Sequence, residues 1–470
     1  MTTGLCYQSA TELVRLIRGK EVSAVDVLES HLQQIEAINP SVNAIVTLAA
    51  DHGRRLAKEV DTKLCHGEDP GLLAGLPIAH KDLVDTKNIR TTYGSRIFAN
   101  HIPDQNSPIV DTLIGAGAVT IGKTNTPEFG AGSQTFNEVF GATLNPYDLA
   151  KTCGGSSGGA AVALATRMLP IADGSDLGGS LRNPANFCNV VGFRTSAGRV
   201  PDTWNSLRIL GPLARTVSDC ALLLNVMAKP NPAIALSSSL DHIDFTKNLE
   251  RDFRGTRIAL SSDFGGQLPV DRAVQKVVSD SAVTFRNLGC EAENICPDLS
   301  EADDIFKTLR AWIFANDHGE IITRHPDLVK ETIIWNTEQG KSLTGEDIYL
   351  AENARAELFK RVQGFMQEFE FLVLPVSQVP PFDVEQEYIS EIDGVEMETY
   401  IDWMKSCYLV SATGLPAISV PAGFTPSGLP VGIQIVGRHY QEHAVLQLAK
   451  AFEQETKFNK RLPDQLEHTV

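Results

Sequence analysis

From about residue 75 onward, short apolar segments alternate with glycine-rich turns and with segments of high helical propensity. Patterns typical of strands occupy residues 118–121, 257–261, 371–374 and 431–436, and patterns typical of helices occupy residues 160–168, 272–288 and much of 300–368. Strands interleaved with helices pack as a sheet covered by helices, so the sequence predicts the α/β class. The chain has no internal repeat and one short linker-like stretch, residues 229–232, which favours a single large domain.

The first part of the chain differs because its apolar residues follow helical spacing. Ser23 is a good N-cap for a helix that Asn39-Pro40 should end, and residues 42–48 then have the pattern of a short strand. We therefore predict a helical N-terminal extension over residues 1–66 and a main domain over residues 67–470, the two forming one compact unit.

An excess of acidic residues limits the partners that this chain can have. Its formal net charge of −17 repels phosphate backbones and anionic membrane surfaces, so we expect no nucleic-acid and no membrane binding. The first residues lack the basic and apolar pattern of a signal peptide, and no stretch approaches 18 uninterrupted apolar residues. The eight cysteines contain no C-x-x-C pair, which favours reduced thiols in a cytoplasmic protein.

Two glycine–serine turns, residues 152–159 and 174–182, are the most informative motifs. A flexible linker is disfavoured because a helical segment follows the first turn at once. A phosphate-binding loop would need a lysine after the last glycine, where Ala160 stands. Residues 154–158 formally satisfy the nucleophile-elbow pattern G-x-S-x-G, but the polar segment before them makes a poor buried strand.

The second turn has the better composition for acyl-transfer chemistry. Cleavage of an amide needs a nucleophile beside backbone N–H groups that stabilise the oxyanion. Leu177, Gly178 and Gly179 supply such a row directly before Ser180, and the two glycines leave the donors uncovered. The nucleophile also needs a base, and a lysine can serve if it is neutral.

A lysine in an apolar segment completes a recognisable pattern. Residues 75–82, which contain Lys81, followed by residues 154–159 and 174–182 in this order, resemble the amidase signature family. Lys81 precedes Ser156 by 75 positions, and Ser156 precedes Ser180 by 24, as in that family. Further similarity lies in residues 122–129, 183–185, 190–193, 414–421 and 432–434, so the resemblance covers most of the chain.

The resemblance implies a mixed, twisted β-sheet covered by α-helices, a small-molecule amide as substrate, and neither a metal nor another cofactor. It implies that Ser180 attacks the amide, that Ser156, which follows a cis peptide bond, relays protons, and that Lys81 is the base. A free lysine has a pKa of about 10.4, so its neutral form costs roughly 4.6 kcal/mol at pH 7. Burial can lower a lysine pKa by about 3–5, and we expect Lys81 to be buried and bonded to Ser156.

Several further positions around this pattern have predicted roles. His80 stands where the family usually has an aliphatic residue, and we expect it to be a structural histidine. Asp176 and Arg182 should form structural hydrogen bonds around the turn. By resemblance, the segment from about residue 310 to 405 shapes the substrate pocket, and the candidates for substrate binding are Gly155, Tyr400 and Trp403. A homodimer through the N-terminal helices is also compatible with the resemblance.

Three alternative functions stay open at this stage. His439 to His443 match the H-x-x-E-H pattern of a zinc hydrolase, but His439 follows a predicted strand and should precede the helix that the pattern requires. The A subunit of tRNA-dependent amidotransferases resembles the same family, although residues 126–129 are more similar to stand-alone amidases. A catalytically inactive scaffold is disfavoured because Lys81, Ser156 and Ser180 are all present.

Overall fold

An eight-stranded mixed sheet forms the centre of the computed structural model, which describes residues 4–202, 205–237 and 243–464. The strand order is β12-β11-β13-β17-β16-β9-β10-β8. The strands are β8 (Ile171–Asp176), β9 (Val191–Arg194), β10 (Ile209–Ala214), β11 (Arg257–Leu260), β12 (Glu291–Asn294), β13 (Phe371–Pro375), β16 (Ala417–Phe424) and β17 (Pro430–Gly437). β11 pairs in parallel with β12 and β13, and the other neighbours in the sheet are antiparallel.

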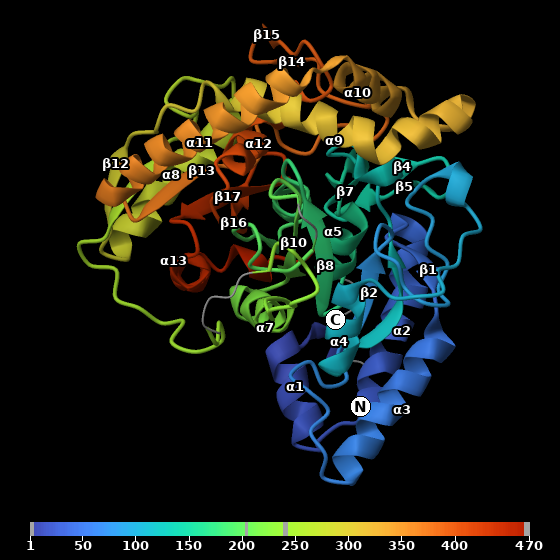
Figure 1. Ribbon diagram of the computed structural model, residues 1–470. Helices are drawn as coiled ribbons and strands as arrows, with labels where there is room; N and C mark the ends of the chain where they lie inside the picture. The colour runs from blue at the N-terminus through green and yellow to red at the C-terminus, as the bar shows by residue number, and fades with distance from the viewer. Residues whose placement is uncertain (1–3, 203–204, 238–242, 465–470) are drawn as a thin grey trace.

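Helices cover this sheet, so its central strands are buried along their whole length. Every residue of β13 and β17 is buried, as expected for apolar strands with packing on both faces. α6 (Arg182–Phe187), α8 (Arg272–Asn287) and α13 (Glu442–Thr456) pack directly against β16 and β17. α9 (Ala302–Arg324) packs against α10 (Glu331–Ser342), α11 (Gly345–Glu368) and α12 (Lys405–Ala412), and Figure 1 shows α9 to α11 as an outer layer over one side of the molecule.

A smaller three-stranded sheet packs against β8 of the large sheet. Its order is β1 (Ile45–Leu48), β3 (Val119–Thr124) and β2 (Pro77–Lys81), with β2 parallel to β3. β2 also packs against β8. β2 ends at Lys81 and β8 ends at Asp176. The lysine and the second glycine–serine turn therefore lie at the ends of two strands that pack against each other.

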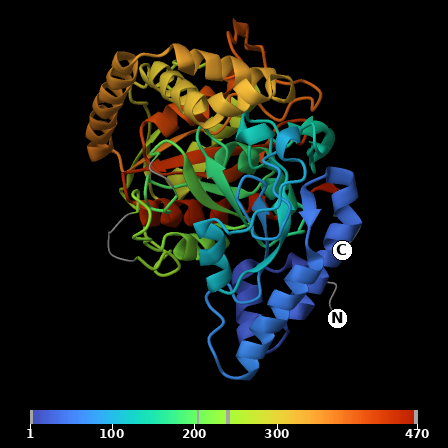
Figure 2. The same ribbon diagram turned by 45° about the vertical axis from the view of Figure 1, so that its right-hand side comes forward.

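The N-terminal helices α1 (Ala10–Arg18), α2 (Ala24–Val42) and α3 (Ala50–Cys65) lie together at one end of the molecule in both views (Figures 1 and 2). Ser23 caps α2 as predicted. The prediction that Asn39-Pro40 ends this helix was wrong, since α2 continues through Pro40 to Val42 and the strand starts only at Ile45. Asn43 adopts the left-handed conformation there, and its N–H donates to the Asn39 carbonyl.

One hydrophobic core joins these parts. A single cluster of buried apolar side chains extends from Ala10 to Phe452 and includes residues of the N-terminal helices and of both sheets. The α/β fold with a mixed sheet and covering helices is thus confirmed, while the boundary at residue 66 stays a prediction. None of the helices in the described ranges is long and apolar enough to cross a bilayer.

The remaining elements are short or lie at the edges. The helices are α4 (Pro108–Gly115), α5 (Gly158–Ala165) and α7 (Val217–Met227), with 3-10 turns at Leu5–Tyr7, Arg96–Phe98, Glu128–Gly130, Pro326–Leu328, Asp402–Met404 and Phe458–Lys460. The strands are β4 (Phe136–Asn137), β5 (Gly141–Ala142), β6 (Leu144–Asn145), β7 (Asp148–Thr152), β14 (Glu391–Ile392) and β15 (Val395–Glu396).

The contact between α9 and α10 gives a test of the fold. A Cβ added at Gly340 would lie 1.9 Å from the Ala311 carbonyl oxygen, so we expect Gly340→Ala to lower the free energy of unfolding by about 1–3 kcal/mol. Gly364 is a matched control because a Cβ there meets nothing within 4 Å, and alanine is the better helix former. Urea denaturation would contradict this packing if Gly340→Ala were as stable as Gly364→Ala.

Candidate active site

Lys81 is fully buried at the end of β2, where hydroxyl groups surround its amine. Its Nζ donates to Ser156 Oγ at 2.7 Å and to Ser175 Oγ at 3.1 Å. Loss of water on burial lowers the pKa of Lys81 to about 7, although the negative charges of Asp176 and Asp173 oppose that shift. A substantial fraction of the amine is therefore neutral at pH 7.

Ser156 follows a cis Gly155–Ser156 peptide bond, as the resemblance implied. The Gly155 N–H donates to Asn183 Oδ1 at 3.1 Å, which ties this turn to α6. β7, the strand before the turn, is largely exposed. The interpretation of residues 154–158 as an elbow after a buried strand is thus not supported.

Ser180 lies on the wall of a cavity that Ser156 and Ser175 also line. The Ser157 N–H donates to the Ser180 carbonyl at 3.3 Å, so the two glycine–serine turns are in direct contact. The structure thus brings Lys81 into contact with Ser156 and places Ser156 and Ser180 on one wall. No hydrogen bond joins the hydroxyls of Ser156 and Ser180 in the part of the chain that the structure describes.

The backbone donors beside Ser180 differ in part from those predicted. Leu177 and Gly178 line the cavity, but the Gly179 N–H donates to Asp176 Oδ1 at 2.8 Å and is not available to an oxyanion. Across the described ranges, the N–H groups of Leu177, Gly178 and Ser180 have no acceptor. The Gly179 N–H is therefore not free as predicted, whereas the Ser180 N–H has no acceptor among the described residues. Gly179 is required for another reason, its φ of +127°.

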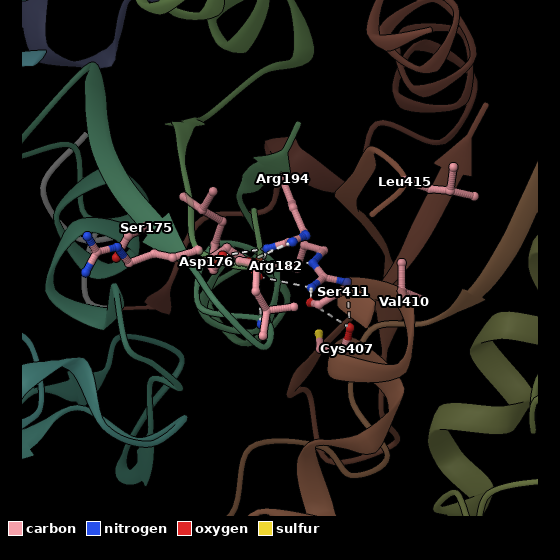
Figure 3. Close-up of polar contacts among 12 residues, drawn as sticks. Ser175, Asp176, Arg182, Arg194, Cys407, Val410, Ser411 and Leu415 are labelled. Carbon is pink, nitrogen blue, oxygen red and sulfur yellow. Dashed lines mark hydrogen bonds and ion pairs between the residues drawn. The ribbon is translucent and has the colours of Figure 1, made fainter. Parts of the chain in front are cut away.

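A buried ion-pair network holds this turn (Figure 3). Asp176 accepts from Arg182 Nε and Arg194 Nη1, each at 3.1 Å, and all three side chains are fully buried. Burial would raise the pKa of Asp176, but the charges of Arg182 and Arg194 outweigh that effect and hold the pKa well below its usual value. Arg182 also donates to Gln434 Oε1 at 2.8 Å on β17 and to the Cys407 carbonyl at 3.0 Å on α12. The expected structural role of Asp176 and Arg182 is thus what the structure shows.

One face of α9 forms most of the opposite wall of the cavity. It contributes side chains at helical spacing, namely Phe306, Arg310, Ile313, Phe314, Asp317 and His318. The other lining residues are Leu83, Phe129, Gly130, Gly132, Ser133, Arg208 and Met404, besides the three serines, Leu177 and Gly178. The signal that could have identified this wall is the run of aromatic and apolar residues three or four apart in a segment that is otherwise charged.

The predicted substrate-binding residues Gly155, Tyr400 and Trp403 are not among those that line this cavity. Tyr400 is buried and accepts a hydrogen bond from Arg310 Nη2 at 2.6 Å. Trp403 is buried against Phe382, with ring centroids 5.1 Å apart. Tyr400 therefore contacts the cavity-lining Arg310 but does not line the cavity itself.

His80, His439 and His443 have structural contacts. His80 Nδ1 lies 2.9 Å from Asp173 Oδ1, and its Nε2 lies 3.0 Å from Thr120 Oγ1. His439 precedes α13, as predicted, and its ring contacts Phe359, while His443 Nε2 bonds to the Lys247 carbonyl at 2.7 Å. Residues 4–202, 205–237 and 243–464 contain no group of three or more histidine, cysteine, aspartate or glutamate residues placed to hold a metal ion.

Comparisons with known proteins all identify one protein family. A family model described as Amidase matches residues 26–446. The A subunit of the glutamyl-tRNA(Gln) amidotransferase of Carboxydothermus hydrogenoformans is 35% identical over 98% of this chain and 99% of the relative. An acylamidase of Rhodococcus erythropolis is 34% identical over 96% of this chain and 95% of the relative. The crystal structure of a bacterial aryl acylamidase of the amidase signature family superposes with a TM-score of 0.90 at 29% identity, covering 97% of each chain.

The network around Asp176 gives a stability prediction. Asp176→Asn keeps the shape of the side chain but leaves two buried guanidinium groups without their counter-charge. We expect it to lower the free energy of unfolding by about 3–5 kcal/mol in urea denaturation. Glu320→Gln, which removes a carboxylate from an exposed pair with Arg324, is the control and should have little effect. Equal, small effects of both substitutions would contradict the role given to Asp176.

Proposed function

This chain belongs to the Amidase family, and from that premise we propose that it acts alone as an acylamidase, with Ser180, Ser156 and Lys81 as its catalytic residues. Enzymes of this family hydrolyse amides, so the open questions are the mechanism and the substrate. The observation that carries the proposal is the buried Lys81 amine 2.7 Å from Ser156 Oγ, on the cavity wall that Ser180 shares.

In the proposed first half-reaction, Ser180 Oγ attacks the amide carbonyl carbon. Its proton passes to Ser156 Oγ, and the Ser156 proton passes to the neutral Lys81 Nζ. The N–H groups of Leu177, Gly178 and Ser180 stabilise the resulting oxyanion. Ser156 then gives a proton to the amide nitrogen and regains one from Lys81, and the carbon–nitrogen bond breaks.

The product of this step is an ester between Ser180 and the acyl group, with the free amine released. In the second half-reaction, water attacks the ester carbonyl and passes a proton through Ser156 to Lys81. The bond to Ser180 Oγ then breaks, Ser180 recovers its proton, and a carboxylic acid leaves. The same three side chains serve both halves, since each returns to its starting protonation state.

Two observations favour a stand-alone acylamidase over a component of an amidotransferase complex. The cavity wall facing the serines is mostly apolar and aromatic, with Phe306, Ile313, Phe314 and Met404, which suits an acyl chain or a ring. The aryl acylamidase structure also superposes with a TM-score of 0.90, against 0.76 for the A subunit of the glutamyl-tRNA(Gln) amidotransferase of Thermotoga maritima. Sequence identity does not separate the two functions, because the amidotransferase relative and the acylamidase relative are 35% and 34% identical to this chain.

The function is tested by assaying the purified chain against aryl amides, alkyl amides, esters, carbamates and glutamine. We expect release of amine from aryl amides without any partner, and a loss of kcat/KM of about 10⁴-fold or more in Ser180→Ala. Ser342→Ala changes an exposed serine at the end of α10 and serves as the matched control. Activity on glutamine alone, dependent on added partner proteins of an amidotransferase, would favour the other function.

The state of Lys81 predicts the pH dependence of the reaction. The base must be neutral, so kcat/KM should rise about tenfold per pH unit below the pKa of Lys81 and level off above about pH 7. Lys81→Arg should lose both activity and this rise, because a guanidinium stays charged. A wild-type profile that kept rising to pH 10 would show that the lysine is not neutralised by burial.

A further inference from the structure

Asp173 is a buried carboxylate near Lys81 that the proposed mechanism does not use. It is only 1% exposed and lies on β8, two residues before Ser175, whose hydroxyl accepts from Lys81 Nζ at 3.1 Å. Residues two apart on a strand share a face and lie about 7 Å from each other. The carboxylate is therefore close to the Lys81 amine, yet the residues that the structure describes form no ion pair between the two.

His80, the neighbour of Lys81 on β2, holds this carboxylate in place. Its Nδ1 lies 2.9 Å from Asp173 Oδ1, and its Nε2 lies 3.0 Å from the hydroxyl of Thr120 on β3. A neutral imidazole satisfies both contacts, because Nδ1–H donates to the carboxylate while Nε2 accepts from the hydroxyl. With the protons assigned in this way, His80 orients Asp173 without cancelling its charge.

The second oxygen of Asp173 shows that this charge is not balanced locally. Asp173 Oδ2 is buried and has no hydrogen-bond partner among the described residues. A buried carboxylate is costly unless a cation or several donors complete its surroundings. Asp176, which also lies near Lys81, differs because Arg182 and Arg194 both pair with it. The charge of Asp173 is thus left to act on the lysine beside it.

The other ionisable groups around the pair are bonded elsewhere. Asp82 accepts from the Thr92 hydroxyl, and Lys123 on β3, which also feels the charge of Asp173, donates to the Val84 carbonyl. α5 and β10, which pack against β8, contain no ionisable side chain. The buried ionisable groups of α2 and α7, which also contact β2 and β8, are His31, Asp219 and Cys220.

A negative charge at this position strengthens Lys81 as a base. Burial lowers the pKa of Lys81 to about 7, the charges of Asp176 and Asp173 oppose that fall, and the charge of Arg208 adds to it. In the proposed mechanism Lys81 becomes an ammonium in the middle of each half-reaction. A fixed carboxylate that does not touch the amine favours this charged form and still leaves the neutral amine free to accept a proton.

We propose that Asp173, held by His80, is the counter-charge for the ammonium that Lys81 becomes during the reaction. The proposal rests on the proposed function, since it concerns the base of the same mechanism. His80 and Asp173 act through Lys81, so they are positioning residues and not catalytic ones. Ser156 then exchanges protons with the lysine, while Asp173 stabilises the charge that the lysine acquires.

Asp173→Asn tests this role because it removes the charge and keeps the shape of the side chain. Two charges about 7 Å apart at an effective dielectric constant of about 20 change a pKa by about 1 to 2. For hydrolysis of p-nitroacetanilide, the rise of kcat/KM should therefore move about 1 to 2 pH units lower. The variant should be more active than the wild type below about pH 6 and less active above about pH 8, because its lysine is a weaker base. A merely structural defect would lower kcat/KM at every pH.

Two further variants sharpen the comparison. Asp219→Asn removes another buried carboxylate, which accepts from the Thr11 N–H at 2.9 Å, and should leave the pH of the rise unchanged. The double variant His80→Leu, Asp173→Ala replaces the pair by apolar side chains of similar total volume, an exchange that often preserves stability. It should show the same move to lower pH, and it decides the test if Asp173→Asn does not fold.

Titration of the Lys81 amine separates this inference from the proposed function. In protein labelled with ¹³C at lysine Cε, we expect the Lys81 midpoint to lie about 1 to 2 pH units lower in Asp173→Asn than in the wild type. A lower midpoint in a chain that hydrolyses no amide would remove the proposed function and leave the coupling of Asp173 to Lys81 standing. A midpoint that is unchanged or higher in both Asp173 variants overturns the inference, even if Lys81 proves essential for hydrolysis.

Discussion

Lys81 reaches full burial beside hydroxyl groups because β2 carries it against the end of β8, where Ser156 and Ser175 accept its hydrogen bonds. A carboxylate in contact would stabilise the ammonium form and keep its pKa high. The two nearby acids are instead occupied by other groups, Asp173 by His80 and Asp176 by two arginines. Their charges reach Lys81 only from a distance, so loss of hydration dominates and the amine becomes available as a base near neutral pH.

Asp176 connects this lysine to the rest of the site. The same carboxylate that two buried arginines neutralise also accepts the N–H groups of Gly179 and Leu181, which shapes the turn before and after Ser180. Arg182 extends that connection to β17 and α12. The turn that carries the backbone N–H groups beside Ser180 is thereby fixed to the core of the large sheet. Preorganised donors of this kind need no rearrangement when charge develops in the reaction. α9 then closes the opposite side and brings both apolar rings and one guanidinium into the cavity.

The α/β class, strands such as β11, β13 and β17 and helices such as α8 could be predicted from the sequence because hydrophobic periodicity encodes them. The contact between Lys81 and Ser156 was predicted from the resemblance to the amidase signature family. The continuation of α2 through Pro40 could not be predicted, since a proline usually marks the end of a helix and this helix ends only at the left-handed Asn43. Gly179 was misassigned because sequence shows a glycine beside a nucleophile but not which N–H a nearby carboxylate takes. Tyr400 and the α9 residues are equally aromatic or apolar in sequence, and only packing decides which of them line a cavity and which support one.

A direct titration of the Lys81 amine tests the central claim. In protein labelled with ¹³C at lysine Cε, the Lys81 signal is identified by its absence from the spectrum of Lys81→Met, and its shift reports the charge on Nζ as pH changes. The account predicts a midpoint near 7, well below the value of about 10.4 for a solvated lysine. A Lys81 that remained charged up to pH 10 would contradict it.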